Sequence, residues 1–325
     1  MGIKKRSMFG PKFKTTRPNR WNKGQKMLNA DAQPLEKIAK PIVEPILEEE
    51  VQKPTEQIKN EDETIEQVAS DIKDALQRQF GSDGRKGDFT LRMSNIGRPS
   101  CQLWYEKNKP EAAVPLPTTF IMNMMLGDIV EAVFKGLLKE AGVKYEDSKK
   151  VTLELSDTNV SGTYDIVIGD AVDDIKSASD WSFRNKFESY ETLASSDGFG
   201  YVAQLAGYAR ASGKQVGGWW VVNKANGDFK YVPAKWMDVD KEIQKVEDTV
   251  SKLKENKFER CFEPEPEKFR GKETGNLVLN KNCIFCSYRY DCWPDMQELP
   301  SVKSSAKEPK IVSYIKLEKE YANAG

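Results

Sequence analysis

The stretch from residue 162 to residue 176 reads GTYDIVIGDAVDDIK, and it decides how the chain folds. Apolar residues at 166–168 and 171–172 stand on either side of Gly169-Asp170, which is a pair typical of tight turns. The pattern predicts a β-hairpin with strands over residues 160–168 and 171–177. With a two-residue turn, the numbers of cross-strand partners sum to 339.

This register brings charged side chains together on one face of the hairpin. Asp165 is expected opposite Asp174, and Thr163 opposite Lys176, with Cβ atoms about 4.5–5.5 Å apart in each pair. Two carboxylates at that distance repel each other unless a cation lies between them. Two oxygen donors beside a lysine suit Mg²⁺ or Mn²⁺. The alternative is a solvated hairpin face with an ordinary Lys–Asp pair.

The flanking segments predict the rest of the fold. Helical periodicity covers residues 118–141, 201–211 and 239–256, and strand patterns cover residues 151–155, 218–222 and 229–232. Trp219 and Trp220 are expected on opposite faces of their strand, one ring inside and one outside. The order predicts an α/β or α+β domain with a mixed central sheet flanked by helices.

Charge is unevenly distributed along the 325 residues, although 50 Lys and Arg balance 50 Asp and Glu. Residues 1–26 are basic and contain no acid, and residues 44–66 are acidic and interrupted by Pro45 and Pro54. This composition predicts a disordered arm and linker over residues 1–84, a folded domain over residues 85–298 and a flexible tail over residues 299–325. Aromatic residues interleave with the basic ones, so the arm suits either a nucleic acid or a protein partner. The nine basic residues are Lys4, Lys5, Arg6, Lys12, Lys14, Arg17, Arg20, Lys23 and Lys26.

Several classes of protein are excluded at this stage. The chain has no histidine, which rules out histidine-based zinc sites and Ser–His or Cys–His catalysis. No apolar run approaches the roughly 18 residues of a membrane span, and no signal peptide is recognisable. We therefore expect a cytoplasmic protein without a membrane partner.

Three cysteines near the C-terminal end have the spacing of a metal site. Cys283, Cys286 and Cys292 are spaced as in zinc ribbons and iron–sulfur proteins. Three thiolates need a fourth ligand, for which Cys101 and Cys261 are the candidates. The spacing alone leaves both candidates open.

Four motifs follow one another in an order that resembles the PD-(D/E)XK nuclease superfamily. The likeness is in particular to its RecB-like branch, which includes the AddB nuclease domain, CRISPR-adaptation nucleases and phage exonucleases. The motifs are G-x-x-x-E at 127–131, G-x-x-D at 162–165, D-x-K at 174–176 and Q-x-x-x-Y at 204–208. The first departs from the family pattern, because Glu131 stands where most members have a histidine metal ligand. The resemblance spans residues 94–292 and implies a restriction-endonuclease-like core.

The resemblance also implies roles for the residues of the motifs. Asp165, Asp174, the Ile175 carbonyl and Glu131 would hold Mg²⁺ or Mn²⁺, which would activate water and neutralise charge on a phosphate. Lys176 would orient or deprotonate the attacking water. The residues expected to contact the DNA backbone share one helix face, and they are Gln204 and Tyr208.

In the iron–sulfur members of this branch, an N-terminal cysteine joins three C-terminal cysteines around a 4Fe–4S cluster. The segment of Cys101, just ahead of Trp104-Tyr105, is similar to the one that carries the N-terminal cysteine in those proteins. The resemblance therefore assigns the four-cysteine staple to Cys101, Cys283, Cys286 and Cys292, and it leaves Cys261 as a spare thiol that is expected to be buried. A structural Zn²⁺ ion is the alternative cofactor. In either case the metal would close a loop around the whole catalytic core and couple metal binding to folding.

We therefore expect a metal-dependent hydrolase, a deoxyribonuclease that acts as an exonuclease in DNA recombination or end processing. Its partners would be DNA and a helicase, a single-strand-binding protein or an annealing protein, because the chain has no nucleotide-binding motif of its own. A phage protein in a bacterial host fits this description. Two alternatives stay open: a catalytically silent DNA-binding or assembly module that keeps the nuclease fold, and a zinc-stapled nucleic-acid-binding protein.

Overall fold

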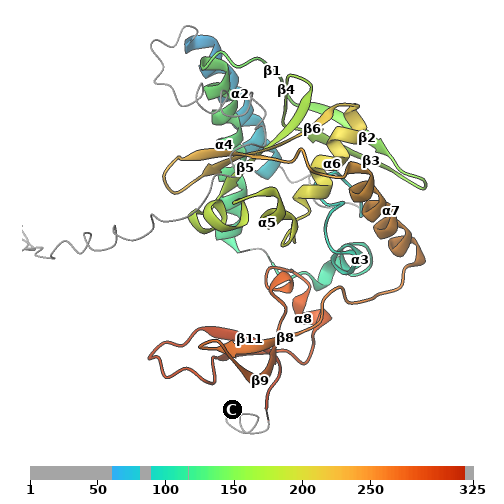
Figure 1. Ribbon diagram of the computed structural model, residues 1–325, viewed down its shortest axis with the longest axis vertical. Coiled ribbons are helices and arrows are strands. Elements are labelled where there is room, and N and C mark those ends of the chain that lie inside the picture. Colours follow the sequence, from blue (N-terminus) through green and yellow to red (C-terminus); the bar gives the residue numbers. More distant parts are fainter. Residues whose placement is uncertain (1–60, 81–88, 116, 319–325) are drawn as a thin grey trace, which may run out of the picture. The chain divides into compact units, whose positions relative to one another are not determined.

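The computed structural model describes residues 61–80, 89–115 and 117–318 (Figure 1). The basic arm and most of the acidic linker lie outside the described residues. None of the described helices is long and apolar enough to cross a membrane.

The centre of the fold is a five-stranded mixed sheet with the order β1-β4-β5-β6-β7. Strands β5 and β6 are parallel, and their neighbours on both sides pair antiparallel. The predicted fold class, a mixed central sheet flanked by helices, is confirmed. The strands are β1 (Tyr145–Glu146), β4 (Ile166–Ile168), β5 (Ala171–Ala178), β6 (Gln215–Asn223) and β7 (Phe229–Pro233).

Helices cover both faces of this sheet. Helix α4 (Thr118–Glu140) packs Phe134 and Leu138 against Trp220 of β6, while α6 (Tyr201–Ser212) and α7 (Val239–Glu255) contribute to the core cluster that contains Trp219. The expectation that one tryptophan ring would be outside is wrong, since Trp219 and Trp220 are 0% and 1% exposed. Both faces of β6 are buried because each face carries its own helical layer.

The predicted hairpin forms in the expected register, but one of its strands is interrupted. Val167 pairs with Val172 and Ile166 with Asp173, as a turn at 169–170 requires. At Asp165 the chain bends and leaves the sheet, and β3 (Asn159–Tyr164) pairs with β2 (Lys149–Glu154) in a separate two-stranded sheet. Thr163 therefore faces Lys150, and its predicted position opposite Lys176 is wrong.

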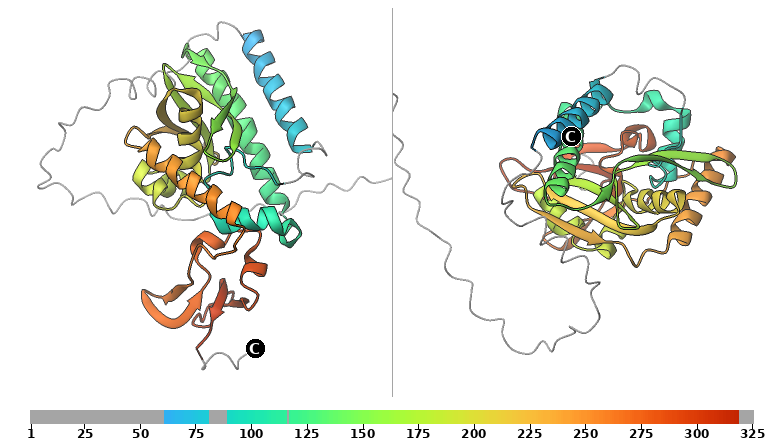
Figure 2. Two further views of the ribbon diagram at one scale, coloured as in Figure 1. Left: turned by 90° about the vertical axis from the view of Figure 1, so that its right-hand side faces the viewer. Right: turned by 90° about the horizontal axis from the view of Figure 1, so that it is seen from above.

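Structure extends beyond the predicted domain bounds at both ends. Residues 61–80, expected to be disordered, form α2 (Glu61–Phe80), which lies along α4 (Figure 2). Thr64 and Ala75 are buried, so the acidic composition conceals an amphipathic helix.

The expected flexible tail instead contributes two strands to a second sheet of order β10-β11-β9-β8. Tyr314 of β11 is 1% exposed, and its hydroxyl donates to Glu267 of β8 at 2.8 Å. This buried hydrogen bond fastens the tail. The strands are β8 (Glu265–Phe269), β9 (Lys272–Val278), β10 (Gln297–Pro300) and β11 (Ile311–Lys316).

The remaining elements are short helices and helical turns. Two of them connect β5 to α6, three contain a cysteine, and η1 follows α3 in the chain. They are α3 (Ser100–Asn108), η1 (Pro110–Ala112), η2 (Ser182–Lys186), α5 (Tyr190–Ala194), η3 (Lys281–Cys283) and α8 (Arg289–Cys292).

A close contact between two glycines fixes the start of α6. A Cβ atom built on Gly97 would lie 2.5 Å from the Cα of Gly200, and one built on Gly200 would lie equally close to Gly97. Gly200 also has a φ of +81°, which L side chains rarely adopt. Farther along α6, Gly207 leaves room for the fully buried Met93. These small residues let α6 approach the 92–98 segment closely.

We expect Gly97→Ala to lower the free energy of unfolding by about 1–3 kcal/mol, because the added methyl overpacks a backbone contact that cannot relax. Gly127→Ala is the matched control. A Cβ there meets only Ser177 Oγ at 3.5 Å, and alanine favours a helix over glycine by roughly 0.5–1 kcal/mol. Urea unfolding curves of both variants check this, and equal midpoints would contradict the packing argument.

Candidate active site

Four of the predicted residues come together where β5 passes the bend at Asp165. Asp174 and Lys176 lie on the same face of β5, and Lys176 Nζ is 2.5 Å from Asp174 Oδ2. Asp165 accepts the backbone N–H of Ile175 at 2.7 Å. Glu131 reaches the same neighbourhood from α4, where its charge acts on Asp174 and the charge of Asp165 acts on it.

Burial of like charges dominates the electrostatics of this cluster. Burial raises the pKa of Asp165 and of Asp174 above the usual range, and the Asp174 charge raises the pKa of Asp165 further. Burial, with the nearby Asp165, also raises the pKa of Glu131 to about 7. The three carboxyl groups therefore hold protons more tightly than exposed carboxyls do.

Lys176 is protonated rather than neutral in this cluster. Burial alone would lower the pKa of its ammonium, but the carboxylates of Asp174 and Asp165 outweigh burial and hold that pKa above its ordinary value. The lysine is therefore a protonated partner of Asp174. Of the two expected roles, this charge state favours orienting a water molecule over deprotonating it.

The donor set fits a hard divalent cation. Neither oxygen of Asp174 has a hydrogen bond of ordinary geometry among the described residues, although Lys176 forms an ion pair with one of them. Carboxylate oxygens are the ligands that Mg²⁺ and Mn²⁺ prefer, and Asp174 Oδ1 has no hydrogen-bond partner among the described residues. Within the described ranges, no three Cys, Asp or Glu side chains are already close enough to hold a metal ion. A cation would have to draw these groups together.

Glu131 is the predicted ligand with the strongest competing contact. Its carboxylate pairs with Lys135, one helical turn along α4, at 2.9 Å. Lys135 is 5% exposed and also contacts Asp147 at 3.2 Å and Ser148 Oγ at 2.6 Å. The sequence analysis missed Lys135, although its i,i+4 spacing from Glu131 was a signal for the pair.

Gln204 and Tyr208 share one face of α6, as predicted. The Gln204 amide donates to the Tyr208 hydroxyl at 3.3 Å, and the charges of Asp165 and Asp174 act on Tyr208. Tyr208 is only 3% exposed, so it has little surface for DNA. We assign Tyr208 to positioning Gln204, which is half-buried and nearer to solvent. Tyr201, on the same face one turn earlier, lies under Lys176 and was also missed.

The predicted cysteines act on one another electrostatically, and Cys261 takes part in these interactions, but no three of the described cysteines are placed to hold a metal. The charges of Cys286 and Cys292 act on Cys283, and the charge of Cys261 acts on both Cys283 and Cys292. Cys261 Sγ accepts the backbone N–H of Cys101 at 3.1 Å. A hydrogen bond from the Cys101 thiol lowers the pKa of Cys261 to about 6. Cys261 is exposed, so the expectation that it is buried is wrong, while its interpretation as a spare thiol stays a prediction.

Comparisons with known proteins add little to this geometry. No protein-family model matches the sequence, and no curated protein matches it. A solved structure described as "Crystal structure of SSO0001" is similar at 15% identity and a TM-score of 0.36, with 58% of this chain and 85% of that chain covered. A likeness at that level supports no argument about fold or function.

The raised pKa of Asp165 has a consequence for stability without metal. Because the folded protein keeps a proton that the unfolded chain releases, the free energy of unfolding should fall as pH rises from about 4 toward the raised pKa. Asp165→Asn cannot ionise, so we expect it to be more stable than wild type at pH 8 by about 1–3 kcal/mol. It should also lose any stabilisation by Mn²⁺.

Urea unfolding in a chelator at pH 5 and pH 8, and thermal melts with and without Mn²⁺, measure both effects. Asp170→Asn is the control, since Asp170 is 71% exposed at the hairpin turn. Identical pH profiles for the two variants would contradict a raised pKa of Asp165 in the folded protein.

Proposed function

We propose that the chain is a Mg²⁺- or Mn²⁺-dependent deoxyribonuclease that hydrolyses phosphodiester bonds. The observation that carries the proposal is the cluster of Asp165, Asp174 and Lys176, in which the buried Asp174 carboxylate lies 2.5 Å from a protonated lysine and beside a second carboxyl. This combination of groups is suited to a divalent cation and a phosphate.

Each residue has a role that follows from its position. Asp165, Asp174 and the Ile175 carbonyl would hold the cation, with Glu131 at the edge of the site. When bound, the cation supplies water activation and neutralises charge on the phosphate. Lys176 stays protonated, orients the attacking water and stabilises negative charge that develops on the phosphate oxygens. Gln204 contacts the DNA backbone.

The cost of burying the cluster argues against a catalytically silent module. Burying a charged pair is often less stable than packing apolar residues of similar volume, and removing one partner is worse still. Asp174 is 1% exposed, and the chain has a carboxylate at this position where an apolar residue would be more stable. A protein that only binds DNA gains nothing from this arrangement, whereas a metal-dependent hydrolase requires it.

The resemblance to RecB-like nucleases guides the finer parts of the proposal. It favours an exonuclease that processes DNA ends in recombination, together with a helicase, single-strand-binding or annealing partner. It also favours a 4Fe–4S cluster held by Cys283, Cys286, Cys292 and a fourth thiolate. The electrostatic contacts among the cysteines support that assignment, and Cys101 and Cys261 are close enough to each other to compete for the fourth position.

We expect Lys176→Ala to reduce cleavage of DNA by about 10²–10⁴-fold, because the lysine acts on the water and the developing charge. Its affinity for DNA should stay within a few fold of wild type. End-labelled linear and circular DNA with Mn²⁺ measures cleavage, and the two substrates separate exonuclease from endonuclease activity. Lys214→Ala, which removes a surface partner of Glu146 and Asp170, is the control. Full activity of the Lys176 variant would remove this residue from the catalytic site.

We expect Cys286→Ser to lose the visible absorbance of an iron–sulfur cluster and to unfold at lower urea concentration, since three thiolates cannot hold the cluster. Cys101→Ser and Cys261→Ser are compared in the same way. The variant that loses the visible absorbance identifies the fourth ligand. A colourless wild-type protein that contains stoichiometric zinc would establish the alternative cofactor, because Zn²⁺ has no visible absorption.

A further inference from the structure

An aromatic stack leads from the catalytic lysine to the surface. Lys176 Nζ lies 5.1 Å from the centre of the Tyr201 ring. Tyr201 stacks on Phe187 and on Phe199, with ring centres 6.0 Å and 5.7 Å apart and interplanar angles of 23° and 14°. Phe187 is 3% exposed, whereas Phe199 is 47% exposed. The stack is therefore anchored in the core and ends at solvent.

A second lysine lies against the outer part of this stack. Lys186 Nζ is 4.7 Å from the ring centres of both Phe199 and Tyr201. Asp197, whose charge acts on Lys186, uses its two oxygens to accept the backbone N–H groups of Gly200 and Val202 at 3.0 and 2.8 Å. In the described ranges Lys186 itself has no ion pair. Its ammonium is thus held in place and available to an anion.

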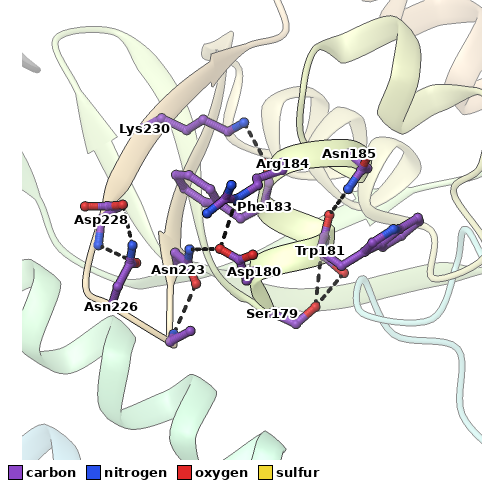
Figure 3. Close-up of polar contacts among 12 residues, drawn as sticks. Ser179, Asp180, Trp181, Phe183, Arg184, Asn185, Asn223, Asn226, Asp228 and Lys230 are labelled. Carbon is purple, nitrogen blue, oxygen red and sulfur yellow. Dashed lines mark hydrogen bonds and ion pairs between the residues drawn. The ribbon is translucent and has the colours of Figure 1, made fainter. Parts of the chain in front are cut away.

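The turn that carries Lys186 is fixed to the sheet. Asp180 accepts hydrogen bonds from Asn223 of β6 and from Arg184, each at 3.0 Å (Figure 3). Lys230 of β7 donates to the Phe183 carbonyl at 2.7 Å and lies over the Phe183 ring. These contacts hold η2, at whose end Lys186 stands, in one position relative to β6 and β7. A binding group on such a support needs little ordering when a ligand arrives.

We propose that Phe199 and Lys186 hold an unpaired DNA strand beside the cleavage centre, with a base stacked on the exposed face of Phe199 and a neighbouring phosphate paired with Lys186. The inference rests on the proposed nuclease function and adds the selection of the substrate. An unpaired base can offer its face to an aromatic ring, whereas bases in a duplex are already stacked on one another. Phe199 thereby favours single strands and frayed ends over intact duplex.

The test measures binding by the full-length protein in Ca²⁺, with a short fluorescent single strand and a blunt duplex of equal length. Phe199→Ala should weaken binding of the single strand about tenfold, within the range for one base stacked on an aromatic side chain, and change duplex binding by about twofold or less. Lys186→Gln should reduce the slope of log affinity against log salt by about 0.7, as expected for one lost single-strand phosphate contact. Phe199→Leu keeps apolar packing on Tyr201 and should be as weak as Phe199→Ala.

Trp236→Ala is the matched control, because Trp236 is 66% exposed and Lys235 lies 5.0 Å from its ring centre in the segment between β7 and α7. Equal losses for Trp236→Ala and Phe199→Ala, or equal losses on single strand and duplex, would overturn the inference. Cleavage by wild type is measured in the same preparation. If wild type cleaves DNA and Phe199→Ala binds the single strand as wild type does, this inference is overturned and the proposed function is not. If wild type does not cleave DNA but Phe199→Ala selectively loses single-strand binding, the result supports this inference and contradicts the proposed function.

Discussion

The constraint on which the site depends is the burial of like charges around a lysine. Asp165, Asp174 and Glu131 come from a bend, a strand and a helix, and full or partial burial together with their mutual repulsion raises the pKa of each. Lys176 offsets part of this charge, and Lys135 offsets the part carried by Glu131. The fold thus gives up stability at this cluster. Under the proposed function, a bound cation and phosphate would make the arrangement favourable.

Local chemistry in the sequence was enough to predict the hairpin, its register and the mixed sheet. The Gly169-Asp170 turn fixes which residues face each other, and β5 follows from it. The break at Asp165 could not be predicted, because it depends on a side-chain hydrogen bond to Ile175 rather than on periodicity. Helix α2 was missed for a related reason. Its few buried residues are buried by α4, which is distant in the sequence, so a local pattern does not reveal them.

For the candidate site, motifs identified the residues that lie on regular elements at fixed spacing. Asp174, Lys176, Gln204 and Tyr208 were recognisable in that way. Contacts between segments distant in sequence were not recognisable: Tyr201 under Lys176 and Cys261 against Cys101 depend on how α6 and the chain after α7 fold back. The same limit explains why Tyr208 was expected to touch DNA, since its burial is a property of the assembled core.

The contact between Cys101 and Cys261, which lie 160 residues apart in the chain, also orders events during synthesis. At 5–20 residues per second, a ribosome needs roughly ten to thirty seconds to make the intervening chain. All strands of the central sheet and helix α7 precede Cys261 in the chain, whereas β8 to β11 follow it. The contact can therefore form only after the whole central sheet has been made, and the Cys101 thiol is without this partner throughout that interval.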